Sequence, residues 1–329
     1  YTDSADGVLL LENSSTNYSP HSEIPSIWTY TEFGSGSAGT ITTGKTDMFG
    51  GTNAVQVDFP SNADNVGILF GTASSGLSSG DCTISIYVKL VESGNKNLQL
   101  RAGFKDIVNV NSTEFTRVDL SGTKTNSEAF NLKLRPSEGT STGGFSIIIC
   151  HPQEENNSYP TSYIPTNGSS VTRQADTASG AGNSEVFNDS EGVLYLNIAA
   201  LVNSDTPRAI SISDGTLANR VYIYYSTNNN IEAAIKVSGT DQAAFTANLT
   251  DSTLFNKIAI KYKENDFAIW VNGIEVNSDL SGSIFNANTL TELAFDLGDG
   301  SNDLYGKTKE LGYYDTALTD AELATLTTI

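Results

Sequence analysis

Apolar and polar residues alternate along most of this chain, in short runs that turn-forming residues separate. The run at 84–90 places four aliphatic residues on one side of an extended strand and polar residues or tyrosine on the other. This period of two is typical of a half-buried antiparallel strand. Similar runs recur between residues 8 and 150 and between 192 and 297, with Gly, Asn, Asp and Ser clusters between them. The pattern predicts an all-β fold of antiparallel sandwiches.

One stretch interrupts the alternation. Residues 160–183 contain two prolines and then a tail rich in Gly, Ser and Ala, which predicts an extended surface connection. We therefore expect two tandem β-sandwich (jelly-roll) domains at 1–165 and 184–329, joined by a linker at 166–183. The pair Asn272-Gly273 between two apolar runs predicts a tight hairpin. The segment 319–322, Thr-Asp-Ala-Glu, has the form of a capping box and predicts a short C-terminal helix.

Charge excludes some classes of partner. The chain carries 18 basic and 38 acidic residues, a formal net charge of −20. Phosphate backbones and anionic membrane surfaces would be repelled, so we expect no nucleic-acid partner. No apolar run approaches the ~20 residues of a membrane span, so we expect no membrane insertion. Solubility of a concentrated or extracellular protein explains the acidity better than a specific cationic partner.

Cysteine and methionine positions add two expectations. Cys82 and Cys150 both lie in apolar runs, which favours two buried thiols and leaves a disulfide between neighbouring strands open. The chain begins at Tyr1, and its only methionine is Met48. We therefore expect a further segment upstream of Tyr1, such as a signal, an anchor domain or a flexible arm.

The sequence contains no spacing pattern of carboxylates or histidines that is typical of a catalytic site. Glycanases on lectin-like sandwiches use carboxylates spaced along one strand, close to Glu-x-Asp-x-x-Glu. Glu264 and Asp266 come nearest, but Ile269 stands where the third carboxylate belongs. His21 and His151 have no neighbouring nucleophile or second metal ligand in sequence. We expect no enzyme activity.

A metal site is one open hypothesis. Asp296, Asp299 and Asp303 supply closely spaced oxygen ligands in a glycine-containing loop, a pattern that suits Ca²⁺. Turns also favour Asp, Asn and Gly for their own backbone geometry, and an ordinary polar turn is the preferred alternative.

Aromatic residues are the candidate glycan contacts, because sugar rings stack their C–H faces on Trp and Tyr. If the alternate residues of 221–225 fill the core, Tyr222 and Tyr224 point outward. Trp270 would join them on one platform, although an ordinary core position for Trp270 is somewhat favoured. Trp28 and Tyr30 in the first half are equally ambiguous. The net acidity argues for neutral glycans unless a cation intervenes.

The second half resembles the concanavalin A-like (laminin G-type) lectin sandwiches. The resemblance rests on KIAIKYKENDFAIWVNGIEV at 257–276 and LYGKTKELGYYDTALTDAEL at 304–323. It covers residues 184–329 and is specific for the fold, whereas this fold hosts lectins, glycanases and structural modules alike.

The first half is similar to a module of structural proteins of tailed bacteriophages. The resemblance rests on the opening GVLLLENSSTN at 7–17 and the closing PQEENNSYPTSYIPTNGSSVTRQAD at 152–176. The residues that match in the closing segment are Gln153, Glu155, 160–166, Thr172, Arg173, Ala175 and Asp176. The opening departs from the usual form at Asn13. The resemblance implies a jelly roll similar to carbohydrate-binding modules.

Together the resemblances imply a non-enzymatic virion surface protein of a tailed phage: a tail fibre, a head fibre or a capsid decoration. Implied partners are other virion proteins, reached through the segment upstream of Tyr1, and cell-surface glycans, with a homo-oligomer on the particle and an extracellular location. A secreted bacterial polysaccharide-binding or adhesin fragment is the main alternative. A glycan-cleaving enzyme is disfavoured.

Overall fold

The computed structural model describes residues 7–32, 39–61, 66–69, 77–101, 105–125, 133–136 and 144–329. Within these residues the chain consists of strands and turns, a 3-10 turn at Pro25–Ile27 and one α-helix, α1 (Asp320–Thr327). Both the all-β class and the short C-terminal helix are therefore confirmed.

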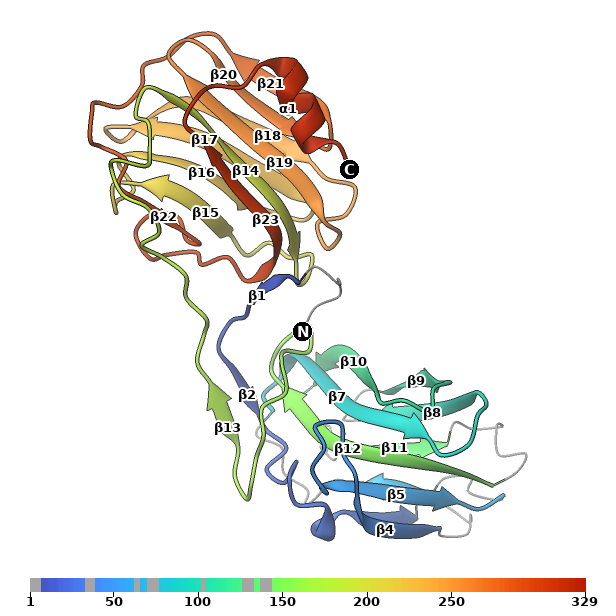
Figure 1. Cartoon of the computed structure of the whole chain (residues 1–329). Coiled ribbons are helices and arrows are strands. Elements are labelled where there is room, and N and C mark those ends of the chain that lie inside the picture. The colour runs from blue at the N-terminus through green and yellow to red at the C-terminus, as the bar shows by residue number, and fades with distance from the viewer. Residues whose placement is uncertain are drawn as a thin grey trace. The chain divides into compact units, whose positions relative to one another are not determined.

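The chain folds into two compact units (Figure 1). The inserted unit comprises Ser14–Gln174, and the terminal unit comprises Tyr1–Asn13 together with Ala175–Ile329. The sequence predicted a division at 165 and 184, with the N-terminal residues in the first domain. The structure differs because β1 (Leu9–Leu11) pairs antiparallel with β23 (Gly306–Tyr314), which lies about 300 positions further along the chain.

The two segments that enter and leave the inserted unit are paired with each other. The Glu12 backbone N–H donates to Asp176 Oδ2 at 2.9 Å, and the Asp176 N–H donates to the Glu12 carbonyl at 2.9 Å. Immediately beyond, β2 (Ser15–Asn17) runs antiparallel to β13 (Val171–Arg173). The opening and closing motifs of the first half therefore meet in space.

Two five-stranded antiparallel sheets form the inserted unit, in the orders β10-β7-β12-β5-β4 and β3-β6-β11-β8-β9. The first sheet contains β4 (Thr40–Lys45), β5 (Ala54–Phe59), β7 (Gly80–Leu90), β10 (Thr116–Lys124) and β12 (Phe145–Glu155). The second contains β3 (Thr29–Glu32), β6 (Val66–Leu69), β8 (Lys96–Arg101), β9 (Lys105–Val110) and β11 (Lys133–Pro136). Their facing side chains form one core with Trp28, Leu98 and Ile147, which includes the four aliphatic residues of 84–90 as the alternation predicted.

The terminal unit is a sandwich of a six-stranded sheet, β1-β23-β14-β19-β20-β21, and a five-stranded sheet, β18-β17-β16-β15-β22. The remaining strands of the six-stranded sheet are β14 (Glu191–Ala200), β19 (Asn256–Lys263), β20 (Phe267–Val271) and β21 (Ile274–Asp279). The five-stranded sheet contains β15 (Arg208–Ser213), β16 (Arg220–Tyr225), β17 (Asn230–Val237), β18 (Thr240–Asn248) and β22 (Glu292–Ala294). Leu194 and Ile260 from one sheet meet Ile223 and Ile235 from the other in a single core. Helix α1 covers part of the opposite face of the six-stranded sheet (Figure 1).

Local sequence signals in the terminal unit are confirmed. Asn272 and Gly273 have φ of 49° and 87°, the left-handed conformations that a two-residue hairpin between β20 and β21 requires. Thr319 and Glu322 form the reciprocal capping box at the start of α1. Among the described residues, no helix has the length and apolar character needed to cross a membrane.

Both cysteines are buried free thiols, so the favoured interpretation of Cys82 and Cys150 is also confirmed.

Candidate functional site

Two tyrosines project from the outer face of the five-stranded sheet of the terminal unit. Val221, Ile223 and Tyr225 of β16 are buried in the core, so the alternate residues Tyr222 and Tyr224 face away from it and are half-buried. Their ring centroids lie 5.7 Å apart, with the ring planes tilted by 32°. This is the outward orientation that the alternation predicted.

The strands beside the tyrosines carry small residues at the positions directly opposite Tyr222. Ser211 of β15 and Ala234 of β17 occupy these positions, and Ala209 lies opposite Tyr224. All three side chains are short and buried, so the half-buried tyrosine rings supply the exposed surface at these positions.

Polar groups adjoin the two rings. The Tyr224 hydroxyl donates to Glu232 Oε2 on β17. Burial, and next this hydrogen bond to a carboxylate, raise the pKa of Tyr224, so the phenol remains a neutral donor. The Arg220 guanidinium carbon lies 4.6 Å from the centroid of the Tyr222 ring, within cation–π range. The face therefore combines aromatic surface with charged hydrogen-bonding groups.

Trp270 does not join this face, which corrects the expectation of a three-residue platform. It lies in β20 of the six-stranded sheet, whereas Tyr222 and Tyr224 lie in the five-stranded sheet. The outer faces of two packed sheets point in opposite directions. Trp270 is 7% exposed and packs with Leu323 beneath α1. The indole therefore lies outside the sandwich core, contrary to the core position that was somewhat favoured, and the helix that covers it comes from far along the chain.

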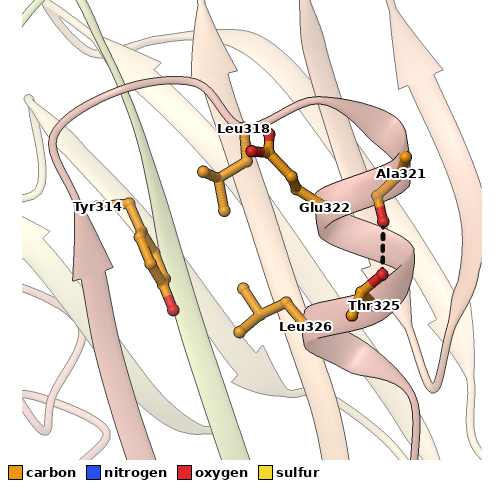
Figure 2. Close-up of a pocket in the computed structure, with 6 residues that line it drawn as sticks. All are labelled: Tyr314, Leu318, Ala321, Glu322, Thr325 and Leu326. Carbon is orange, nitrogen blue, oxygen red and sulfur yellow. Dashed lines mark hydrogen bonds between the residues drawn. The ribbon is translucent and has the colours of Figure 1, made fainter.

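A groove lies beside α1 in the terminal unit (Figure 2). Its volume is ≈ 530 Å³, and it is lined by Tyr314, Leu318, Ala321, Glu322, Thr325 and Leu326. Glu322 accepts from the Thr319 backbone N–H at 2.8 Å, and Thr325 Oγ1 donates to the Ala321 carbonyl at 2.8 Å. Because the helix uses these polar groups itself, the groove is poorly equipped to hold a hydroxyl-rich ligand.

The aromatic candidates of the inserted unit are less accessible. Trp28 is 4% exposed, lies in the core and donates its indole N–H to the His21 carbonyl at 3.1 Å, so it offers no stacking face. The backbone of Tyr30 is in β3, and its side chain lies outside the described part of the structure.

The predicted Ca²⁺ ligands serve the turns of their own loop. Asp296 and Asp299 each accept from the backbone N–H two residues further on, at 2.6 and 3.1 Å, and Asp303 accepts from the Tyr305 hydroxyl at 3.0 Å. In the described ranges, no group of three or more His, Cys, Asp or Glu side chains is placed to hold a metal ion. The structure thus does not bring the three aspartates together as a ligand set.

The carboxylates considered for glycan cleavage are separated by their surroundings. Glu264 is exposed, and Asp266 Oδ1 lies 2.6 Å from Lys261 Nζ in an ion pair. Ile269, at the third position of the expected motif, is fully buried in the core.

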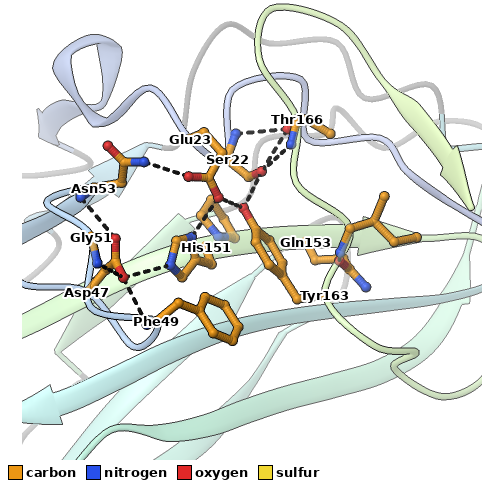
Figure 3. A network of polar contacts seen from close by, with 12 residues as sticks. Ser22, Glu23, Asp47, Phe49, Gly51, Asn53, His151, Gln153, Tyr163 and Thr166 are labelled. Carbon is orange, nitrogen blue, oxygen red and sulfur yellow. Dashed lines mark hydrogen bonds and ion pairs between the residues drawn. The ribbon is translucent and has the colours of Figure 1, made fainter.

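A buried polar network in the inserted unit was missed by sequence reasoning (Figure 3). His151 is 3% exposed and lies between two carboxylates, with Nδ1 2.9 Å from Glu23 Oε1 and Nε2 3.7 Å from Asp47 Oδ1. Asp47 also accepts from the backbone N–H groups of Phe49, Gly51 and Asn53, which fixes the turn before β5. No local signal could have revealed this cluster, because His151 lies more than 100 positions beyond Glu23 and Asp47.

The closing motif belongs to an adjoining set of buried contacts. Gln153 Oε1 accepts from the Ile164 N–H at 2.7 Å, while Glu155 accepts from the Ser15 hydroxyl at 2.7 Å and from the Thr161 N–H at 3.0 Å. Gln153 and Glu155 are both fully buried. Their polar atoms hold the segment after β12 against the chain entry, which accounts for these motif residues through folding rather than ligand contact.

Comparisons with known proteins place the chain in no family. No family model matches it, and no curated protein matches it. Similar solved structures include the CBM40 module of the Ruminococcus gnavus IT-sialidase bound to α2,3-sialyllactose, with 14% identity and a TM-score of 0.39 over 46% of this chain and 94% of that chain. Domain 4 of AbnA, a GH43 extracellular arabinanase from Geobacillus stearothermophilus in complex with arabinotriose, has 12% identity and a TM-score of 0.37 over 49% of this chain and 74% of that chain. At this level of similarity no residue or ligand of these proteins is assigned to the chain.

Proposed function

We propose that the chain is a non-enzymatic, extracellular glycan-binding protein and that the β16 face of the terminal unit is its contact surface. The pair of outward rings, Tyr222 and Tyr224, carries the proposal. Rings 5.7 Å apart suit the C–H faces of one or two sugar rings. The half-buried Glu232 beside Tyr224 would supply an acceptor for a sugar hydroxyl.

A single such site should bind weakly. Only the two half-buried rings project from this face of the sheet, so most hydroxyls of a bound sugar stay hydrated and few ring faces stack. We expect dissociation constants in about the millimolar range. Several copies presented together would convert this into useful avidity without any new contact.

We further propose that the copies are presented on the surface of a tailed-phage particle, as a fibre or decoration protein. Support for this comes from the opening and closing motifs of the inserted unit. A secreted bacterial adhesin built from the same modules is the alternative. Mass spectrometry of purified particles separates the two, since absence of the chain from every particle would exclude the virion assignment.

A glycan array with the full chain in multivalent display tests the glycan proposal. Tyr222→Ala should lower the response to any bound glycan by about tenfold, because it removes one stacking face. Tyr314→Ala is the matched control, since Tyr314 is also half-buried but lines the groove on the other sheet. Equal losses in the two variants, or binding that survives Tyr222→Ala and Tyr224→Ala together, would exclude the β16 face. No response to any glycan would exclude the function.

A further inference from the structure

A small pocket of the terminal unit lies between the segment that precedes β14 and the loop that joins β21 to β22. Its volume is ≈ 260 Å³, and it is lined by 187–190 and by Phe285, Ala287 and Asn288. This volume is just below the about 300–1,000 Å³ of pockets for drug-sized ligands, so the pocket can take one small ring. No lining residue belongs to β16, so the pocket is separate from the proposed glycan-contact face.

One wall of the pocket is held in place by hydrogen bonds to the end of the six-stranded sheet. The Asn188 backbone N–H donates to the Tyr313 hydroxyl at 2.6 Å, and the Asn188 carbonyl accepts from the Tyr262 hydroxyl at 2.8 Å. The Asn188 side chain donates to the Asp315 carbonyl at 2.7 Å and accepts from the Ser190 N–H at 3.0 Å. Every polar group of Asn188 is therefore engaged, and the wall is ordered before any ligand binds.

Asp189 is the charged side chain among the residues that line the pocket. Its Oδ1 accepts from the backbone N–H groups of Leu290 at 2.8 Å and Thr289 at 3.2 Å. Within the described residues, its Oδ2 has no hydrogen-bond or ion-pair partner, and it is not one of the buried atoms that lack a partner. Oδ2 is therefore accessible to solvent. An asparagine would make the same two backbone contacts through its own Oδ1, so these contacts do not require the negative charge.

Two phenylalanine rings supply the apolar part of the pocket lining. Phe187 and Phe285 belong to the core of the terminal unit and are 5% and 6% exposed. Aromatic surface beside a carboxylate favours an organic cation. A divalent metal ion requires several oxygen ligands, and in the part of the chain that the structure describes no three acidic, His or Cys side chains are grouped to provide them.

We propose that this pocket binds a primary ammonium group carried on a small ring, as in an unacetylated amino sugar or a simple cyclic amine. The ammonium group donates to Asp189 Oδ2 in a charge-assisted hydrogen bond, and the ring lies against the exposed parts of Phe187 and Phe285. The residues that line the pocket include no basic side chain that would neutralise the carboxylate in place of the ligand. This site goes beyond the proposed glycan contacts on β16 and does not depend on them.

Ligand-observed NMR titration of the full chain tests the proposal with glucosamine, cyclohexylamine, N-acetylglucosamine and glucose, at about pH 6, where amines are protonated. At least one of the two amines should bind in about the millimolar range. The uncharged N-acetylglucosamine and glucose should bind about 10- to 100-fold more weakly, because they cannot form the charge-assisted bond. The two amines distinguish the sources. Tighter binding of glucosamine assigns the pocket to amino sugars, and cyclohexylamine binding at least as tightly assigns it to simple amines.

Two variants locate the bound amine. Asp189→Asn keeps the Oδ1 acceptor and removes the charge, so it should weaken amine binding about 10- to 100-fold without lowering the urea midpoint. The matched control is Asp251→Asn, because Asp251 is also half-buried and accepts from the Thr253 backbone N–H at 2.8 Å. This control removes the same charge elsewhere and should leave amine binding unchanged. Ala287→Phe fills the pocket with the carboxylate still present and should abolish binding, which keeps the test valid should Asp189→Asn fail to fold.

Several results would overturn the ammonium site. These are the absence of binding by both amines, equal binding of glucose and glucosamine, and amine binding that survives Asp189→Asn. Loss of binding in Asp189→Asn but not in Ala287→Phe would place the amine outside the pocket and would also overturn the proposal. Each of these results leaves the β16 glycan proposal standing, because that proposal rests on other residues.

Discussion

Asn17→Ala tests whether the contacts at the chain entry stabilise the inserted unit. The Asn17 side chain is fully buried, and its Oδ1 accepts from the backbone N–H groups of Ser19 at 2.9 Å and Glu154 at 3.1 Å. Its Nδ2 donates to the Ile164 carbonyl at 2.8 Å and, at a longer 3.4 Å, to the Pro152 carbonyl. The substitution leaves two backbone donors and two acceptors without this partner. Counting about 1 kcal/mol for each of the three short bonds, we expect the free energy of unfolding to fall by about 3 kcal/mol.

Tryptophan fluorescence during urea unfolding measures this change. The chain has two tryptophans. Trp28 lies in the core of the inserted unit and Trp270 beneath α1, so a Trp270→Phe background reports the inserted unit alone. With a urea dependence of about 1–3 kcal/mol per M, the midpoint should fall by about 1–3 M. The control is Asn167→Ala at an exposed position, which should stay within about 0.5 kcal/mol. If Asn17→Ala shifts the midpoint no more than this control, the buried contacts do not carry the stability assigned to them.

Three further predictions concern other buried or capping groups. Burial raises the pKa of the Cys150 thiol to about 12, so iodoacetamide should alkylate it only as fast as the inserted unit opens; faster labelling of the folded chain would contradict its burial. Burial alone would raise the pKa of Asp47, but the backbone N–H groups bonded to it hold the pKa below its usual 3.8. The ionised Asp47 carboxylate therefore contributes its full stabilisation above pH 3.8, and this contribution is lost as the pH falls through the lower pKa of the folded state. Asp47→Asn should accordingly flatten the fall of the urea midpoint below about pH 4. An unchanged slope would refute the assignment. Thr319→Ala removes the helix cap and should lower the unfolding free energy of the terminal unit by about 1 kcal/mol in the Trp270 signal, with the exposed Thr316→Ala as a control without effect.

Sequence patterns predicted what depends on neighbours along the chain. Alternation along one strand sufficed to orient Tyr222 and Tyr224, and the Asn272-Gly273 turn and the Thr319 cap are each defined within a few residues. Each of these features is decided by backbone geometry that repeats at short range. Their positions could therefore be predicted without knowing the topology.

Features that depend on which strands meet could not be predicted. Trp270 and Tyr222 have the same outward orientation in their own strands, but only the sheet order assigns them to opposite faces. Period and composition do not encode such long-range pairings, so the short residues opposite Tyr222 and Tyr224 could be identified only once the register of β15 and β16 was known.

Because β1 belongs to the terminal sandwich, the inserted unit lies in sequence between the first and second strands of that sandwich, and the two units do not simply follow one another along the chain. Truncation at residue 184 would strip the six-stranded sheet of its outermost strand and leave the backbone of β23 bare, an edge that invites pairing with other chains. Excising 14–174 and joining Asn13 to Ala175 would keep that strand, because Glu12 and Asp176 are already hydrogen-bonded neighbours. The terminal unit alone is therefore best obtained by deleting the middle of the gene, and the evolutionary counterpart of this deletion would be the insertion of one module into a loop of another.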